Sequence, residues 1–135
     1  MIKGLKFSYG SETHIISRLA GEIKNLVVNN LRGSDKVFSI ESQCWGNDML
    51  MSATGNTRNR EFGILIGEGY TAERALEKMK KENKTVEGIN TVRAVKKIMK
   101  QCKYKPPLLY GTSKIILGKK SARKSILHLM KSNQI

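Results

Sequence analysis

The chain has 135 residues, of which 39% are hydrophobic and 27% are charged, and its formal net charge is +14 at pH 7. This length predicts one ordinary domain spanning residues 1–135, and the composition is that of a globular protein, which excludes a disordered chain. No apolar run is long enough for a signal peptide or a membrane span, so we expect a cytoplasmic protein.

The positive charge predicts an anionic partner, because such a surface attracts nucleic acid, acidic lipid headgroups or small phosphates. The lysines are dispersed along nearly every segment, and aromatic residues make up only 6% of the chain. RNA-binding sheet motifs, zinc-finger spacings and Gly-rich clamps are absent from the sequence. These features argue against nucleic acid, and a general bias toward Lys, Asn and Ile is another explanation for the charge.

The first predicted element is a helix from about Glu12 to Asn30, with Ser11 or Thr13 as its cap. Its apolar face has the spacing of an α-helix and consists of Ile15, Ile16, Leu19, Ile23, Leu26 and Val27. Gly33 and Ser34 end this pattern. The segment from Asp35 to Ile40 then predicts a short helical turn.

A break at "WGND" leads into "MLMSAT", and a second break covers Gly55 to Thr57. Thr57 is a predicted N-cap for the helix "RNREFGILIG", which should end near Gly67 to Gly69. Thr71 is the predicted cap of the next helix, "TAERALEKMKKEN".

Three more helices are predicted after residue 86. The first is "EGINTVRAVKKIMKQC", and Pro106 and Pro107 open the second, "LLYGTSKIIL", which stops at Gly118. Ser121 is predicted to cap the last one, "ARKSILHLM". Because strand-like alternation and hairpin signals are lacking, we predict an all-α fold, a compact multi-helix domain of about seven or eight helices.

The stretch around Arg58 has the features of an anion site. The predicted helix start at Thr57 offers free backbone N–H groups and the positive end of the helix dipole. Arg58 can form bidentate hydrogen bonds to phosphate, and Asn59 can donate or accept. Asp48 lies ten residues before Arg58, across a glycine break, so two helices can meet there end to end. An ordinary capped helix with solvated arginines explains the same residues.

Other sites are not indicated by the sequence. Cys44, Cys102, His14 and His128 are isolated, so a metal centre is not expected and the cysteines are predicted to be reduced thiols. A Ser–His or Cys–His pair and a G-x-G-x-x-G fingerprint are also lacking, so the chain cannot supply a complete dinucleotide-binding fold.

The stretches "GNTRNREFGILIGEG", "TVEGINTVRAVKKI" and "KYKPPLLYGTSKIILGKKSARKSILHLM" resemble, in this order, the C-terminal domain of NAD(P)-dependent glycerol-3-phosphate dehydrogenase. In addition, "GLKFSYGSETHIISRLAGEIKNL" is similar to the first long helix of that domain, and "WGNDMLMSAT" resembles its Gly-Asp-Leu-x-x-Thr stretch. The combination of Arg-Asn-Arg with Val-Glu-Gly is more specific than either motif alone. The resemblance implies a fold like the C-terminal domain of 6-phosphogluconate-dehydrogenase-type enzymes.

The resemblance also implies a substrate site. Asp48 takes the place of the family's active-site aspartate, which holds the substrate and helps to orient the catalytic lysine. Thr57, Arg58 and Asn59 match the Ser-Arg-Asn that binds glycerol 3-phosphate. Asp48 as a plain helix cap is the structural alternative.

Contacts to NAD or NADP are implied for Arg58, Thr85 and Glu87. A loop residue and an N-terminal helix acid are the structural alternatives for Thr85 and Glu87. The family's catalytic lysine acts as general base within a Lys-Asn motif, which we expect just upstream of Met1, so no catalytic residue is assigned in this chain. Lys3 and Lys6 are not followed by Asn.

The chain departs from the family pattern at four further positions. Gly10 and Glu12 stand where the family usually has Asn and then Arg or Lys, Asn47 replaces a Gly, and Ser52 stands where Thr is common.

The sequence therefore predicts the substrate-binding domain of a glycerol-3-phosphate dehydrogenase without its N-terminal dinucleotide-binding domain. Its partners would be sn-glycerol 3-phosphate or dihydroxyacetone phosphate and a separate Rossmann-type chain. A homodimer, in which a second copy of the chain is the partner, is an open alternative. We expect the chain alone to be inactive, and an apolar patch where the other domain would pack. The alternatives are a folded relic, and a non-catalytic basic helical module that binds nucleic acid or an acidic partner.

Overall fold

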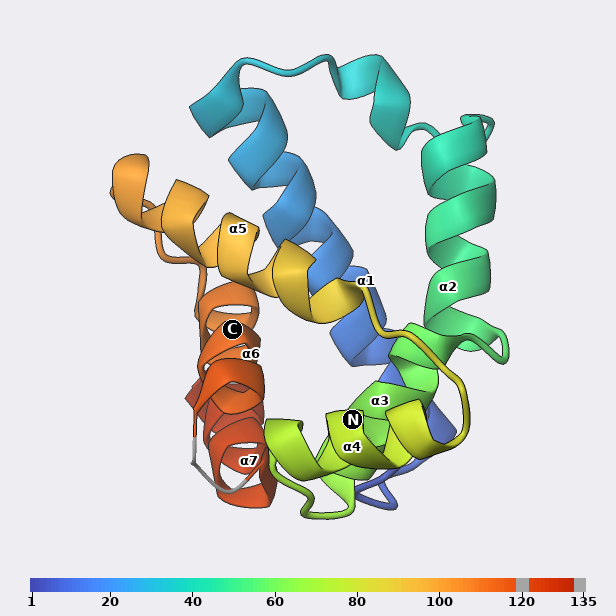
Figure 1. Cartoon of the computed structure of the whole chain (residues 1–135). Helices are drawn as coiled ribbons and strands as arrows, with labels where there is room; N and C mark the ends of the chain where they lie inside the picture. Colours follow the sequence, from blue (N-terminus) through green and yellow to red (C-terminus); the bar gives the residue numbers. More distant parts are fainter. Residues whose placement is uncertain (119–121, 133–135) are drawn as a thin grey trace.

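The computed structural model describes residues 1–118 and 122–132, and within them every regular element is a helix (Figure 1). The seven α-helices of these residues are α1 (Tyr9–Asn25), α2 (Leu50–Thr54), α3 (Arg58–Gly67), α4 (Ala72–Lys81), α5 (Gly88–Gln101), α6 (Pro107–Leu117) and α7 (Ala122–Ser132). A π-helical segment, Leu26–Asn30, extends α1, a 3-10 turn covers Asp35–Phe38, and a second π-helical segment, Gln43–Met49, runs into α2. The all-α prediction is confirmed.

The helix caps follow local sequence at two of the predicted sites. Thr57 caps α3 and Thr71 caps α4, since each hydroxyl oxygen accepts a hydrogen bond from the backbone N–H three residues later, at 3.3 Å in both cases. For α1 the prediction of Ser11 or Thr13 is wrong. Ser8 is the cap, and its hydroxyl oxygen accepts from the N–H of Ser11 at 3.2 Å. The predicted cap Ser121 lies outside the described residues.

The start of α6 is capped by a residue from another helix. Pro106 is the N-cap residue and offers no side-chain hydrogen bond, and Pro107 occupies the first turn as predicted. Glu22 of α1 instead accepts from the backbone N–H of Leu108 at 3.1 Å and from that of Leu109 at 2.7 Å. This carboxylate satisfies two of the free N–H groups of the helix and complements its dipole, so it fixes α6 against α1.

The core lies where α6 packs against α1, α5 and α7 and where α3 packs against α4. Buried residues from each of these helices form the core, and they include Ile15, Phe62, Leu65, Met79, Ile89, Leu108, Ile115 and Ile126. Ile2 and Leu5 join this core from the segment that precedes α1.

The segment from Val27 to Thr57 forms an arm that contains no buried residue, although all of its residues are described. In Figure 1 it arches from the end of α1 over to α2, which stands apart from α5 and α6. Large apolar side chains of the arm are exposed, among them Ile40 at 72% and Met51 at 55%. The arm is therefore held by its own local contacts, by the 2.6 Å ion pair of Asp35 with Lys24 of α1, and by its connection to α3.

None of the helices in residues 1–118 and 122–132 combines the length and the apolar character that crossing a bilayer needs.

Candidate functional site

The start of α3 is tied to the helix before it. The Thr57 hydroxyl donates to the carbonyl oxygen of Ser52 at 3.1 Å while its oxygen accepts from the Arg60 N–H. Thr57 therefore has a structural role in the sharp junction between α2 and α3. Its hydroxyl is only half-buried and lies beside the first turn of α3, whose N–H groups have no intrahelical partner.

The two arginines at this helix start have different environments. The Arg60 guanidinium donates to the Glu12 carboxylate of α1 at 2.8 Å and to the carbonyl oxygen of Ala53 at 3.1 Å. The Arg60 and Glu12 side chains are 15% and 17% exposed. Arg58 is exposed, and its side chain makes no hydrogen bond or ion pair with the residues that the structure describes. Arg60 thus holds the fold together, and Arg58 is the guanidinium available to a ligand.

Asn59 connects the starts of α3 and α5. Its side-chain oxygen accepts from the backbone N–H of Gly88 at 3.0 Å, although 29 positions separate the two residues. This bond joins the start of α5 to the first turn of α3, so the two stretches singled out by the resemblance meet at one edge of the molecule. Arg58, Thr85 and Glu87 of these stretches are all exposed.

A second link between α3 and the loop before α5 runs through Lys84. Its ammonium group donates to Glu61 at 2.8 Å and to Glu82 at 2.7 Å. The hydrogen bonds to these two carboxylates, Glu61 first, raise the pKa of Lys84. The loop therefore keeps its position against α3 through a charged contact as well as through Asn59.

Asp48 is not brought into hydrogen-bond contact with this edge. It is exposed in the π-helical segment Gln43–Met49, and its carboxylate accepts from the Asn47 side chain at 3.3 Å. Within the described residues it makes no hydrogen bond or ion pair with Thr57, Arg58 or Asn59. The helical residues between Asp48 and Thr57 put it on the order of 10 Å further along the arm.

A cavity of about 280 Å³ lies beside the start of α3. It is lined by Lys3, Gly55, Asn56, Thr57, Arg60, Glu61 and Ile64. Of these lining residues only Thr57 was predicted as a site residue, and the predicted Asp48, Arg58 and Asn59 are not among them. Local spacing contains no signal for Lys3, because the segment before α1 reaches this position only by lying along α3. A larger cavity of about 820 Å³ is lined by residues around the far end of α3, including Glu68 and Tyr70.

The described residues contain no group of three or more His, Cys, Asp or Glu side chains that could hold a metal ion. Cys44 is exposed and Cys102 is half-buried, and neither forms a disulfide. For a phosphate this edge offers the free Arg58 guanidinium and helix N–H groups, and it also carries the carboxylates of Glu61, Glu82 and Glu87, two of which are paired with Lys84.

Comparison with known proteins identifies the family of the chain. The family described as NAD-dependent glycerol-3-phosphate dehydrogenase C-terminus matches residues 1–127. The chain belongs to this family. The resemblance seen in the sequence is thereby confirmed, and the edge formed by α3 and α5 is an edge of a glycerol-3-phosphate dehydrogenase C-terminal domain.

Among the similar curated proteins are two named glycerol-3-phosphate dehydrogenase [NAD(P)+]. They come from Francisella tularensis subsp. novicida (strain U112) and Francisella tularensis subsp. tularensis (strain WY96-3418). Each is 31% identical over 127 residues, which cover 94% of this chain. The chain spans about 37% of the length of these dehydrogenases. No solved structure matches it.

Proposed function

We propose that this chain is the substrate-binding domain of a glycerol-3-phosphate dehydrogenase and holds the phosphate of glycerol 3-phosphate or dihydroxyacetone phosphate at the start of α3. The observation that carries the proposal is Arg58, an exposed guanidinium in the first turn of α3 without a partner among the described residues. It has this position in a chain whose family is named for that dehydrogenase.

The chemistry of the α3 start fits a phosphate dianion. The free N–H groups of the first turn and the helix dipole favour negative charge, and Arg58 adds two parallel hydrogen bonds. In this proposal the Asn59 NH2 group donates a further hydrogen bond, and the Thr57 hydroxyl donates one after it releases the Ser52 carbonyl oxygen. Asp48 then holds the glycerol hydroxyls, which requires the arm to move toward α3 when the substrate binds.

The cofactor is proposed to contact the chain along the same edge, through Arg58, Thr85 and Glu87. These side chains are exposed, so they would contact one side of the cofactor and would not enclose it in a pocket. When bound, NAD(P) supplies the hydride acceptor or donor. None of the residues proposed for this edge is assigned as the base that takes the proton from the C2 hydroxyl. We therefore expect no dehydrogenase activity from the chain alone.

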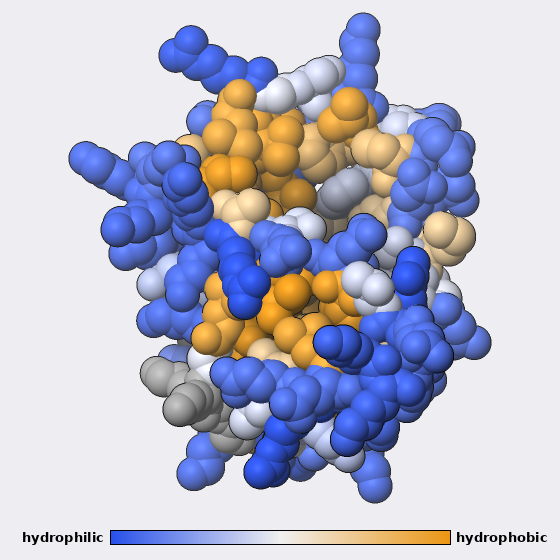
Figure 2. All heavy atoms as spheres, in the orientation of Figure 1, coloured by the Kyte–Doolittle hydropathy of each residue, from blue (hydrophilic) through white to orange (hydrophobic). Residues whose placement is uncertain are grey.

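The face that would meet the rest of the enzyme is a groove between α1 and α2. Figure 2 shows apolar side chains gathered around a hollow in its upper half, where Figure 1 places α1 and α2. The groove has a volume of about 280 Å³ and is lined mainly by apolar groups, namely Ile16, Leu19, Ala20, Ile23, Trp45, Met49, Ser52 and Ala53. An apolar groove of this kind is typical of a surface that another segment covers.

We expect the chain alone to self-associate through this groove, because its apolar surface is open to water. Analytical ultracentrifugation should show dimers or larger species that increase with concentration. Met49→Lys places a charge in the groove and should shift the chain toward monomer. Leu127→Lys, on the exposed surface of α7, is the matched control and should not. A monodisperse monomer at high concentration would contradict the expectation.

Binding of glycerol 3-phosphate to the chain and to Arg58→Ala tests the proposed site. We expect saturable binding by calorimetry, and at least a tenfold loss of affinity in the variant, about 1.4 kcal/mol or more. Arg74→Ala, which removes an exposed arginine from the first turn of α4, is the matched control and should bind as the unmodified chain does. Equal binding by all three proteins, or none by the unmodified chain at millimolar ligand, would reject the site.

A further inference from the structure

The charge of the chain is divided unequally between its two parts. The 48 residues from Gly88 to Ile135 contain twelve of the 25 Lys and Arg residues and none of the eleven Asp and Glu residues. The first 87 residues contain thirteen cationic residues and all eleven acids. A general bias toward lysine raises the number of lysines in every segment, but it does not remove every acid from three successive helices. The division therefore concerns α5, α6 and α7 in particular.

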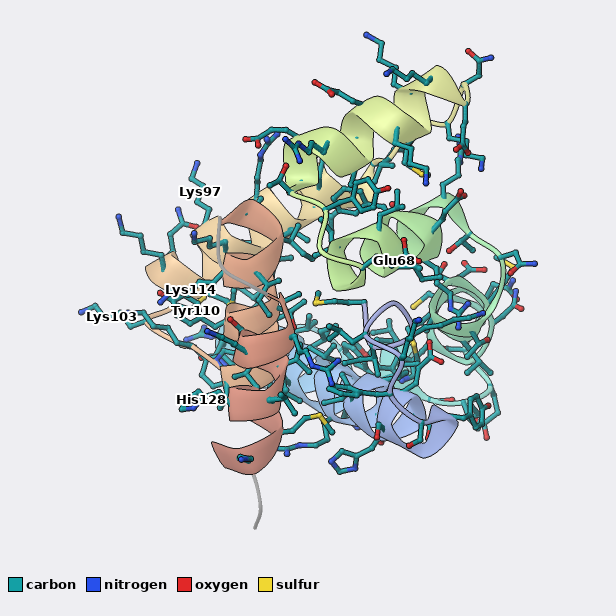
Figure 3. The ribbon with its side chains drawn as sticks, turned by 90° about the horizontal axis from the view of Figure 1, so that it is seen from below. Glu68, Lys97, Lys103, Tyr110, Lys114 and His128 are labelled. Carbon is teal, nitrogen blue, oxygen red and sulfur yellow. The ribbon has the colours of Figure 1, made fainter. Side chains whose placement is uncertain are left out.

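The fold brings lysines of these helices to one side of the molecule. Figure 3 shows Lys97 of α5, Lys103 of the next connection and Lys114 of α6 on the same side as Tyr110 and His128. The labelled acid, Glu68, lies away from them. Lys105 and Lys124 complete a surface that we call the basic face, defined as Lys97, Lys103, Lys105, Lys114, Lys124, Tyr110 and His128.

Tyr110 is the aromatic centre of the basic face. The ammonium group of Lys114 lies 4.8 Å from the centroid of its ring, and that of Lys105 lies 5.7 Å from it. Beside the ring a groove of about 510 Å³ runs between α6 and α7. Lys114 lines this groove from α6, and Lys124 and His128 line it from α7.

One acid, Glu22 of α1, lies at the start of α6, where Pro107 lines the groove. Its two oxygens already accept the N–H groups of Leu108 and Leu109, at 3.1 and 2.7 Å. It is therefore directed into the helix end. The lysines of the basic face take part in none of the ion pairs found among the described residues.

We propose that the basic face binds the phosphate backbone of single-stranded nucleic acid, without reading its sequence. A cationic groove that follows the backbone, with an aromatic ring beside it for a base, is the arrangement by which proteins bind single strands non-specifically. An acidic membrane would also attract the lysines. Stable membrane binding, however, needs apolar side chains that project into the lipid. Among the described residues of α5, α6 and α7 the exposed large hydrophobic side chain is Leu127, at 38%.

This binding uses none of the residues assigned to glycerol 3-phosphate. Asn59 contacts only the start of α5, whereas the basic face begins in the second half of that helix. The two functions can therefore fail or hold independently.

The test is fluorescence anisotropy of the full chain with a labelled DNA or RNA single strand of about 20 nucleotides, which exceeds the length that one small domain covers. The triple variant Lys103→Gln, Lys114→Gln, Lys124→Gln should lose at least tenfold in affinity. Each phosphate contact adds about 0.7 to the slope of log affinity against log salt, so this variant should also lower the slope by about 2.

Two matched variants make the result specific to the basic face. Lys36→Gln, Lys80→Gln, Lys81→Gln removes the same charge from exposed sites in the first 87 residues and should bind like the unmodified chain. Arginine at positions 103, 114 and 124 keeps the charge and should also retain binding. Far-UV circular dichroism checks that each variant is folded.

Three outcomes would overturn the proposal. The first is the absence of single-strand binding at about 50 mM salt, where phosphate contacts are strongest. The second is an equal loss of affinity in the two glutamine variants, which would show that net charge alone decides. The third is that the chain binds vesicles of acidic phospholipid but does not bind the single strands, and that the triple glutamine variant at Lys103, Lys114 and Lys124 loses the vesicle binding.

Discussion

Arg60→Met is expected to lower the free energy of unfolding by about 2–4 kcal/mol, because it leaves the Glu12 carboxylate largely buried without its partner. The substitution also removes the 3.1 Å hydrogen bond from Arg60 to the Ala53 carbonyl oxygen. Both contacts join the start of α3 to other segments, α1 in one case and α2 in the other. Urea unfolding followed by circular dichroism measures the effect.

A double-mutant cycle separates the ion pair from the other roles of Arg60. Glu12→Gln alone should cost less, about 1–2 kcal/mol, since the amide oxygen still accepts a hydrogen bond. The double variant should lose about 1–3 kcal/mol less free energy of unfolding than the sum of the losses in the two single variants. Additive effects would mean that Glu12 and Arg60 do not interact in solution.

The same pair explains a departure from the family pattern. By the resemblance described above, the family usually has Arg or Lys where this chain has Glu12. In the structure Glu12 neutralises Arg60 and leaves Arg58 as the free cation at the helix start. Glu12→Lys should therefore be more destabilising than Glu12→Gln, because it places two cations together.

Local signals in the sequence were sufficient to predict most of the helices and two of their caps. The predicted break at "WGND" is wrong, because these residues lie within the π-helical segment Gln43–Met49. Thr57 and Thr71 each precede a helical pattern and accept a hydrogen bond within three residues, so their roles depend on neighbours that the sequence shows directly. Ser8 was missed because the first turn of α1 has no apolar periodicity: Tyr9 and Gly10 are both exposed.

The contacts that assemble the site could not be predicted in this way. Asn59 meets Gly88 across 29 positions, and Arg60 meets Glu12 across 48. Such pairs depend on how the helices pack, and a single sequence contains no measure of that packing. The resemblance indicated which stretches belong together, and the structure adds the hydrogen bond that joins them.

Apolar patterning also could not separate the core from an uncovered surface. Ile40 and Met51 are as apolar as the core residues Ile15 and Met79, yet both are exposed on the arm. Hydrophobic residues indicate burial, but burial can be against this chain or against another segment.

Gly4→Ala is expected to destabilise the chain by about 2–4 kcal/mol, at the upper end of the usual cost of overpacking. A Cβ atom at Gly4 would lie 2.1 Å from the carbonyl oxygen of Ile64, and one at Gly67 would lie 2.2 Å from that of Met1. In both places the added Cβ atom would meet a backbone carbonyl oxygen, and no side-chain rotation can relieve such a clash. The segment before α1 would have to move away from α3.

That movement would withdraw Ile2 and Leu5 from the core and Lys3 from the cavity beside Thr57. Gly21→Ala is the matched control, because a Cβ atom there meets nothing within 4 Å and the site lies within α1. Alanine at Gly21 should stabilise the chain by about 0.5–1 kcal/mol, since glycine is the weaker helix former. The midpoint of thermal unfolding should therefore fall in Gly4→Ala and rise in Gly21→Ala. Equal midpoints for the two variants would show that the first residues do not lie against α3.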